Sequence, residues 1–596
     1  MSFECARPEF AIIACTMSVA RPQLLRFGAF QIDLHSGELS KNGVRLRLQP
    51  QPLRVLSLLA SRPGEVLSRM EIEREIWGKE THVDFNVGLN YCIKQIRAVL
   101  EDDASKPAFI ETLPRRGYRF ISSIAKHERP ASHKRLMLAV LPFSNLTGNA
   151  EQEYFADGMT EEIIGQLGRL KPQKLGVIAF TSAMAYKQTP KGIDEIGQEL
   201  GVDFILEGSV RRAGDRVRIA AQLIQVSDQT HLWAEAYNRT IEDIISIQVD
   251  VAERVARSLA LELLADHQES MTRASTRTSV AYEAYLKGCY YWNKRTEDGF
   301  RKALVNFSEA IAKDPNYAPA YVGVADVYNI IAFYSGVPPR EAYEKSKTAT
   351  TKALQLDETL AEAHTAAAYA KALYGWEFAE AERTFRRALD LNPNQVTGHY
   401  WFALFLAGLG RLDEAFVLID RALELDPLSP VINCHKGWIL YFARRYDLAL
   451  AQLRDVIEMD PNFALARYFI GLVYVQKGAF DQAIVEFKGA RDISENHPAA
   501  LAGLAACLAL TGKRAESRRI LENLMTLAKR RYVAPYYIAA VHLAFGERQQ
   551  AFRWLEKSFE EKSAYMTNLM HDPALDRIRS EPEFQHLVRR VGLAGK

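Results

Sequence analysis

A 34-residue period in the second half of the chain constrains its fold more than any other feature. Pro393, Pro427 and Pro461 lie 34 residues apart, and each follows a helical run. Small residues at 403, 437 and 471 are each followed twelve positions later by alanine. Small side chains let two antiparallel helices pack closely, and proline ends a helix. The period predicts an all-helical solenoid over residues 279–591, with about seven or eight helix pairs.

This pattern resembles the tetratricopeptide repeat. The resemblance implies a concave surface that binds a peptide or a protein partner. The aromatic residues of the repeats are expected to lie mostly in the core, and we assign a ligand contact to none of them: Tyr290, Tyr291, Trp292, Tyr400, Trp401 and Trp438.

Length and composition limit the remaining possibilities. A chain of 596 residues is expected to form about three to five domains. Its net charge is only +2, so any affinity for nucleic acid must come from a local patch. The six cysteines are scattered without a C-x-x-C pair, which argues against disulfides or a zinc site and suits a reducing cytoplasm. No apolar run reaches the roughly 20 residues that span a membrane.

Residues 136–266 alternate between strand-like and helix-like runs. "RLMLAVLPF" and "KLGVIAF" are typical of buried strands, whereas "FADGMTEEIIGQLGRL" and "GIDEIGQELG" are typical of helices. A hairpin is predicted to turn at Ala213-Gly214-Asp215, and a long helix is predicted over 241–264. Alternating strands and helices predict an α/β domain. Arg211 and Arg212 suggest a phosphate site, but we favour a solvated hairpin with Asp215 nearby.

Residues 22–125 begin with strand-like segments and continue into three helices, predicted over 52–60, from Ser68, and over 86–100. Ser68 and Glu71 have the spacing of a capping box, in which each side chain satisfies a backbone amide of the first turn. Two strand-like runs, 109–113 and 118–121, close the domain as a hairpin. The basic stretch 126–135 is predicted to be a linker.

The third predicted helix has one apolar and one polar face. At about 100° per residue, the apolar face carries Leu89, Cys92, Ile93, Ile96, Val99 and Leu100. The polar face carries Asn90, Tyr91, Lys94, Gln95 and Ala98, with Arg97 at its flank. No carboxylate occurs on that face before Glu101-Asp102-Asp103, where acidic residues oppose the helix dipole. Such a face can offer donors and acceptors to base edges in the major groove.

The hairpin carries Arg115 and Arg116 at its turn and Arg119 just beyond. Adjacent like charges repel each other, so this arrangement favours an anionic ligand. Guanidinium groups there can reach DNA phosphates or a narrow minor groove. Together, the helix face and the hairpin predict binding to double-stranded DNA.

Three segments, "RFGAFQIDLHSGEL", "LNYCIKQIRAVLEDD" and "FIETLPRRGYRF", resemble the OmpR/PhoB-type winged-helix domain. The resemblance implies that the third helix is the recognition helix, that the hairpin is the wing, and that protomers pair on DNA. No receiver segment precedes the domain, so a one-component design is expected rather than control by aspartyl phosphorylation. Arg97 has an alternative partner in Glu101, and Tyr118 an alternative place in the core. The candidate DNA-binding residues are Asn90, Tyr91, Lys94, Gln95, Arg97, Thr112, Arg115, Arg116 and Tyr118.

The segments "LAVLPFSNLTGNAEQEYFADGMTEEIIGQL" and "GVDFILEGSVRRAGDRVRIAAQLI" are similar to the TolB-like amino-terminal domain. Relatives with this domain are bacterial regulators and some nucleotide cyclases, and many place a membrane span before it. Here the linker is short and charged, so the expected location is cytoplasmic with no membrane contact.

Motifs for nucleotide, zinc and serine-hydrolase chemistry are absent: G-x-x-x-x-G-K-[ST], H-E-x-x-H and G-x-S-x-G. We therefore expect no enzyme activity, no cofactor and no metal. The overall prediction is a multidomain transcription regulator: a winged helix-turn-helix (α+β), then an α/β TolB-like domain, then an all-α solenoid. RNA polymerase is a further candidate partner. The alternative is an interaction scaffold with weak or vestigial DNA binding.

Overall fold

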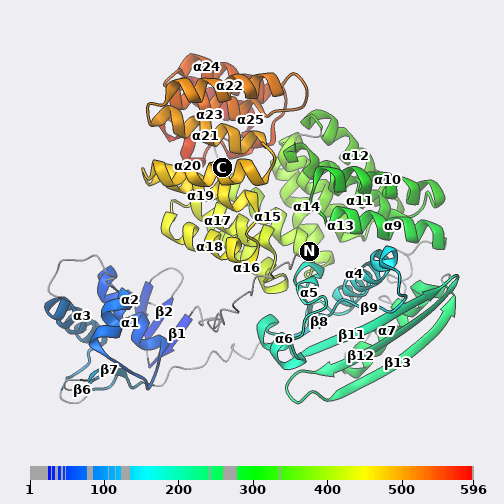
Figure 1. The fold of residues 1–596 in the computed structure, drawn as a ribbon, viewed down its shortest axis with the longest axis horizontal. Coiled ribbons are helices and arrows are strands. Elements are labelled where there is room, and N and C mark those ends of the chain that lie inside the picture. Colours follow the sequence, from blue (N-terminus) through cyan, green and yellow to red (C-terminus); the bar gives the residue numbers. More distant parts are fainter. Residues whose placement is uncertain are drawn as a thin grey trace, which may run out of the picture. The chain divides into compact units, whose positions relative to one another are not determined.

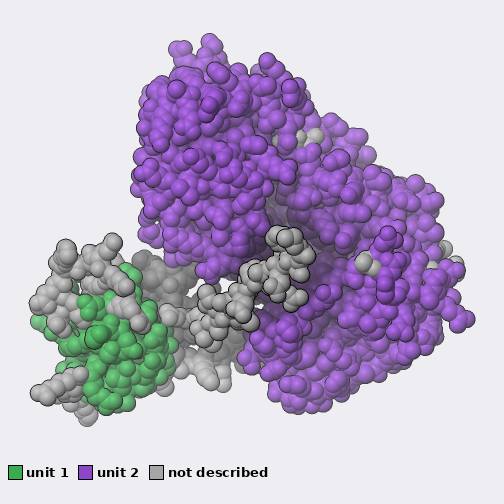
Figure 2. All heavy atoms as spheres, viewed as in Figure 1, with its two compact units in different colours: residues 1–134 green, residues 135–596 purple. Residues whose placement is uncertain are grey.

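The computed structural model describes residues 24–593, except 29, 34–37, 42–43, 47, 77–84, 105–106, 114–115, 123–134, 241–242, 260–277 and 335–336. The chain divides into two compact units, residues 1–134 and 135–596 (Figure 2).

The described residues of the first unit form a four-stranded antiparallel sheet, three helices and a three-stranded sheet of order β5-β7-β6; Figure 1 shows the helices beside the strands. Its core contains the apolar face predicted for the third helix, including Leu89, Ile93 and Ile96. The winged-helix fold is thereby confirmed. The elements are β1 (Leu24–Phe27), β2 (Phe30–Asp33), β3 (Glu38–Lys41), β4 (Val44–Leu46), α1 (Pro50–Ser61), β5 (Val66–Leu67), α2 (Arg69–Ile76), α3 (Phe85–Leu100), β6 (Ile110–Leu113) and β7 (Gly117–Phe120).

The capping box at the start of α2 forms as predicted. The Ser68 amide donates to the Glu71 carboxylate at 2.8 Å, and the Glu71 amide donates to the Ser68 hydroxyl at 3.2 Å. Two amides without helical partners are thus satisfied reciprocally, which fixes where α2 begins.

The second unit begins with the α/β domain. Its sheet has the order β10-β8-β11-β12-β13, with β9 beside β11. The predicted hairpin is β11–β12, which pairs Ala213 with Arg216 at its turn. The elements are β8 (Leu136–Val140), β9 (Ser144–Asn145), α4 (Glu153–Leu170), β10 (Leu175–Val177), α5 (Phe180–Met184), α6 (Ile193–Leu200), β11 (Phe204–Ala213), β12 (Arg216–Gln225), β13 (His231–Thr240) and α7 (Ile244–Ser258).

Three features of this domain differ from the sequence predictions. β13 is a ten-residue strand that was not predicted. The helix predicted over 241–264 is α7, which ends at Ser258, and part of the predicted range lies outside the described residues. The Arg212 side chain is not simply solvated, because it pairs with Glu283 at 3.3 Å and lies over the Phe155 ring.

Helix pairs follow, as the period predicts. Gly437 lies so close to the facing helix that an added Cβ would come within 2.6 Å of Leu453, which explains the small residues of the repeat. The helices are α9 (Ser279–Trp292), α10 (Glu297–Lys313), α11 (Ala318–Ile331), α12 (Pro339–Leu356), α13 (Ala361–Ala370), α14 (Phe378–Leu391), α15 (Val396–Gly408), α16 (Leu412–Leu425), α17 (Pro430–Phe442), α18 (Tyr446–Met459), α19 (Ala464–Gln476), α20 (Phe480–Ile493), α21 (Pro498–Leu510), α22 (Arg514–Leu527), α23 (Pro535–Phe545), α24 (Arg548–Glu560) and α25 (Pro582–Val591).

The α/β domain and the solenoid share a continuous hydrophobic core that includes side chains of α4, α9 and α11. Polar contacts add to it at the loops that end successive repeats. The Asn394 amide donates to the carbonyl oxygens of Gly168 and Leu175, at 2.8 and 2.9 Å. The buried Asp426 carboxylate accepts from the Ser182 amide at 3.0 Å and from its hydroxyl at 2.5 Å. These contacts make residues 135–596 one packed unit.

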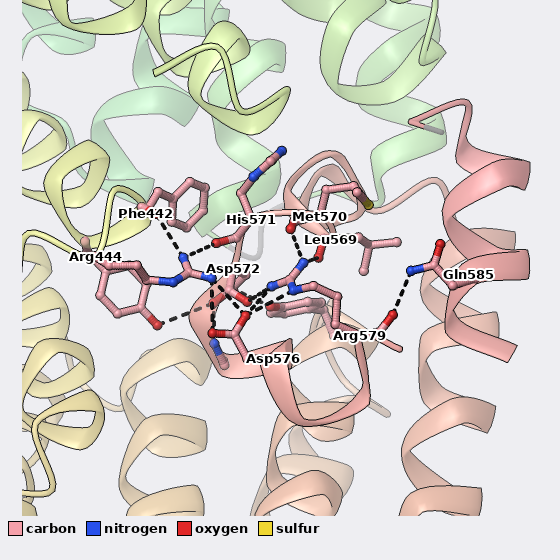
Figure 3. A network of polar contacts seen from close by, with 12 residues as sticks. Phe442, Arg444, Leu569, Met570, His571, Asp572, Asp576, Arg579 and Gln585 are labelled. Carbon is pink, nitrogen blue, oxygen red and sulfur yellow. Dashed lines mark hydrogen bonds and ion pairs between the residues drawn. The ribbon is translucent and has the colours of Figure 1, made fainter. Parts of the chain in front are cut away.

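Residues 563–579, which we call the C-terminal strap, lie between early and late repeats of the solenoid. Met566 and Leu569 are fully buried in the same core cluster as Trp401 of α15 and Tyr537 of α23. Figure 3 shows Arg444, which follows α17, donating to the His571 carbonyl at 2.7 Å and to Asp576 at 2.8 Å. The solenoid is therefore closed by its own chain along these repeats.

Among the described residues, no helix is long and apolar enough to cross a membrane. Cys92, Cys289, Cys434 and Cys507, the four cysteines within the described ranges, are buried free thiols.

Candidate nucleic-acid interface

Helix α3 presents its predicted polar face to solvent. Asn90, Tyr91 and Lys94 are exposed, and Gln95 is half-buried. Tyr91 is 46% exposed, which is unusual for a large ring and leaves it available to a ligand. The helix begins at Phe85, one residue earlier than predicted, and ends at Leu100.

The hairpin β6–β7 contributes Thr112 and Arg116, both exposed. Arg115 lies outside the described residues. Gly117 has φ +140°, and a Cβ there would lie 2.0 Å from the Leu67 carbonyl oxygen. Glycine is therefore required where β7 passes β5. Arg119 is paired with Glu111 at 2.6 Å, so its charge is already compensated within the protein.

Arg97 connects α3 to the hairpin. Its guanidinium donates to the Ile110 carbonyl at 2.7 Å and to the Thr112 hydroxyl at 3.0 Å. The predicted alternative partner, Glu101, instead pairs with Lys41 at 2.8 Å. Arg97 thus holds the hairpin against the recognition helix, which limits its freedom to reach a ligand.

A second connection joins α2, α3 and β7. Tyr118 is only 3% exposed, so its ring lies in the core, which was the alternative interpretation of this residue from the sequence. Its hydroxyl donates to the Asn90 side-chain oxygen at 3.2 Å, and the Arg69 guanidinium donates to both groups, at 2.9 Å to Tyr118 and 3.1 Å to Asn90. The network fixes the Asn90 side chain on the outer face of α3.

Asp102 explains why a carboxylate lies at the C-terminal end of α3, where the helix dipole disfavours it. Asp102 is only 8% exposed. Its carboxylate accepts hydrogen bonds from the backbone amides of Ala108, Phe109 and Ile110, at 2.6, 3.1 and 2.9 Å. It therefore anchors the start of the hairpin to the end of the helix. The three amides compensate a carboxylate that the helix dipole disfavours.

Between α3 and the hairpin lies a hollow of about 350 Å³, lined by Asn90, Ile93, Lys94, Arg97, Asp102, Asp103, Ala104 and Tyr118. The structure brings five of the nine predicted residues together. Four of them line the hollow, namely Asn90, Lys94, Arg97 and Tyr118, and the fifth, Thr112, is bonded to Arg97. Sequence reasoning missed Arg69 and the anchoring role of Asp102. The signal for Asp102 was its unfavourable place at a helix C-terminus.

Several families match successive parts of the chain. Residues 43–120 match the C-terminal domain of transcriptional regulatory proteins. Residues 133–254 match the second domain of HilA/YgeH-like transcriptional regulators, in the region likened above to the TolB-like domain. Tetratricopeptide repeats match residues 371–430, 435–498 and 474–534.

Three relatives show how far the similarity extends. A Rhizobium meliloti protein named as adenylate cyclase 3 is 32% identical over 59% of this chain and 53% of its own length. The transcriptional regulator HilA of Salmonella typhimurium is 24% identical over 70% of this chain and 73% of its own. The regulatory protein AfsQ1 of Streptomyces coelicolor is 38% identical over 16% of this chain and 41% of its own.

The chain spans about half of the cyclase-named relative and about three quarters of HilA. Its domains follow one another in the order regulator-type winged helix, HilA/YgeH-like second domain, repeats. This protein therefore combines an OmpR/PhoB-type winged helix with a HilA-like second domain and a tetratricopeptide solenoid.

Proposed function

We propose that this protein is a transcription regulator that binds double-stranded DNA through its winged helix. The observation that carries the proposal is the outer face of α3, where Asn90, Tyr91 and Lys94 are exposed beside an exposed hairpin arginine, Arg116. A regulator-type match over residues 43–120 supports it.

Within this proposal the predicted residues have different roles. Lys94 and Arg116 contact phosphates or base edges directly, together with Tyr91, Gln95 and Arg115. Arg97, Thr112 and Tyr118 are engaged inside the domain, so we assign them to positioning the hairpin and Asn90. Contacts to phosphates position the protein on the duplex, whereas contacts to base edges determine sequence preference.

The second unit is proposed to regulate this binding. The proposed boundaries are a winged helix at 22–125, a linker at 126–135, an α/β domain at 136–266 and a solenoid at 279–591. The repeats support a protein or peptide partner, of which RNA polymerase is one candidate, and pairing of protomers on DNA is part of the proposal. Because the proposed ligand is DNA, we place the protein in the cytoplasm.

We propose no catalytic role for this chain. The cyclase-named relative is matched over only 53% of its length, and HilA and AfsQ1 are regulators by name. The alternative, a scaffold with vestigial DNA binding, gives no role to the exposed polar face of α3 beside Arg116.

The test is a double substitution, Lys94→Ala with Arg116→Ala, in the full chain. Duplexes selected from a random library by the wild-type protein serve as the probe. Removing two phosphate contacts should weaken binding at least tenfold and lower the slope of log affinity against log salt by about two. The matched control removes two exposed cations of the solenoid, Lys488→Ala with Arg519→Ala, and should bind as wild type. Equal affinity of both variants would refute the proposal.

A further inference from the structure

Strand β13 lies at the edge of the α/β sheet (Figure 1). It is ten residues long, His231–Thr240, and pairs antiparallel with β12 over almost its whole length. Among the described residues no other strand pairs with it. The opposite edge of β13 therefore offers a long row of backbone donors and acceptors.

Natural proteins protect such edges with proline, charged side chains (lysine above all), a bulge or a covering element. The sequence "HLWAEAYNRT" contains neither proline nor lysine. The pairing of β12 with β13 has one register shift, between Leu223 and Ile224 of β12, which lie opposite the start of β13. Nine of the ten residues are at least partly exposed, Tyr237 being the buried one. The charged residues of β13 are Glu235 and Arg239. An edge this long, with two charges and one register shift, is suited to pairing with another strand.

We propose that β13 pairs antiparallel with β13 of a second copy of this chain and joins two α/β sheets into one. This interface deepens the proposed function, on which it rests for its purpose, because a dimer carries two winged helices for two adjacent half-sites. A two-fold interface uses the same strand on both subunits, so its residues must complement themselves.

The sequence of β13 meets that requirement in one register. With Ala236 opposite Ala236 of the second copy, all residues from 232 to 240 find a partner. Arg239, for which no acidic partner is found among the described residues, then lies opposite Trp233 and diagonal to Glu235 of the other strand. A guanidinium over an indole and a diagonal ion pair are both favourable.

The neighbouring registers fit less well. A shift by one pair in one direction sets Glu235 directly opposite Glu235, which is destabilising. A shift in the other direction pairs Tyr237 with Tyr237 and leaves Leu232 and Trp233 without partners on the added strand. The two small alanines at the axis favour the first register, since they let the strands approach without a clash.

Helix α7 covers the face of the sheet beside this edge. Arg254 of α7 pairs with Glu235 at 2.8 Å, and the exposed Arg257 lies one turn further along the helix. Pairing of the edges would therefore bring two α7 helices near each other on one side of the extended sheet, which enlarges the interface beyond the two strands.

The first experiment measures self-association of the full chain by sedimentation equilibrium, without DNA. Ala236→Lys places two ammonium groups opposite each other at the axis and should weaken dimerisation at least fivefold. Ala213→Lys makes the same change at an exposed site on the hairpin turn and should leave dimerisation unchanged. A wild-type monomer at all concentrations, or equal behaviour of both variants, would overturn the proposal.

The second experiment tests the register with a short bismaleimide crosslinker. Ala236→Cys should crosslink between copies, because directly opposite residues lie about 5 Å apart. Asn238→Cys should not, because residue 238 of one copy lies about 14 Å along the strand from residue 238 of the other. Wild type gives the background from native thiols. The reverse pattern, or no crosslink at 236, would refute this register.

The two proposals fail separately. If the winged helix does not bind DNA, sedimentation and crosslinking still report on β13. If β13 does not pair, Ala236→Lys and wild type bind a two-half-site duplex with the same cooperativity. If both proposals hold, Ala236→Lys binds a single half-site as wild type does but loses cooperativity on the paired site.

Discussion

The two regions expected to bind partners are built in opposite ways. The winged helix exposes polar side chains of α3 and the hairpin to solvent. Hydrogen bonds inside the domain, such as that from Arg97 to the Ile110 carbonyl, hold the hairpin against the helix. The solenoid instead closes along several repeats around its own strap, with Met566 and Leu569 fully buried. A sequence shows where basic side chains lack acidic neighbours along the chain. It does not show which surface another part of the same chain will cover.

This difference changes what each region offers to a partner. The outer face of α3 with Asn90, Tyr91 and Lys94, which we call the reading surface, is exposed to solvent and accessible to a ligand. A peptide that enters the solenoid beside α15 and α17 would instead have to displace the strap. Exposing even the two buried strap side chains named above would cost about 3–6 kcal/mol. We therefore expect a protein partner to bind the solenoid away from the strap.

The largest expected effect tests whether the strap is core. Leu569→Ala should destabilise the second unit by about 2–5 kcal/mol, the usual cost of emptying a fully buried leucine site. Chemical denaturation of the full chain measures the change. Leu146→Ala, at a half-exposed leucine, is the matched control and should cost less than about 1 kcal/mol. A loss below about 1 kcal/mol for Leu569→Ala would make the strap a loosely held segment and remove the contrast.

An intermediate effect concerns the reading surface. Asp102→Ala leaves three backbone amides of the hairpin start without their acceptor. We expect a loss of about 1–3 kcal/mol in the stability of the first unit and weaker DNA binding, because the hairpin is no longer fixed to α3.

The control for Asp102 is its neighbour. Glu101→Ala breaks only the exposed ion pair with Lys41 and should cost about 0–1 kcal/mol. If both variants bind DNA as wild type does, the reading surface needs no buried anchor.

The smallest expected effect concerns the contact between the α/β domain and the solenoid. Burial raises the pKa of Asp426 to about 6, although hydrogen bonds from Ser182 oppose the rise. A raised pKa means that the folded state binds the proton more tightly than the unfolded state. This stabilisation is complete below about pH 4 and is lost as the pH rises through 6.

Between pH 5 and 7 the loss from Asp426 should be about 1 kcal/mol. Asp426→Asn keeps an acceptor for Ser182 but cannot ionise, so its stability should change less over that range. Denaturation curves of the two proteins at both pH values measure the difference. The same pH dependence in both would show that another group is responsible.

Much of the fold could be predicted from local patterns. The 34-residue period located the helix pairs of the solenoid, and the spacing of Ser68 and Glu71 located the start of α2. The apolar positions of α3 followed from its helical wheel. Each of these patterns is a spacing of at most 34 residues along the chain, so the sequence alone contains the information.

The candidate site was only partly predictable. Lys94 and Arg116 are exposed as expected, but Tyr118 and Arg97 are held by partners from other elements. Nothing near Arg69 in the sequence indicates that it bonds to Asn90, 21 residues away. Hydrogen bonds between distant segments depend on how those segments pack.

By itself, then, the sequence determined the order of the domains, the helical repeat and the amphipathic recognition helix, because each follows from the spacing of neighbouring residues. Only the tertiary structure decided that Asp102 anchors the hairpin, that β13 forms an open edge and that the strap closes the solenoid. The bonds of Asp102 span only 6 to 8 residues, whereas the contact of Arg444 with the strap spans 127. In each case the contact depends on how one segment folds back on another, which the local pattern does not encode.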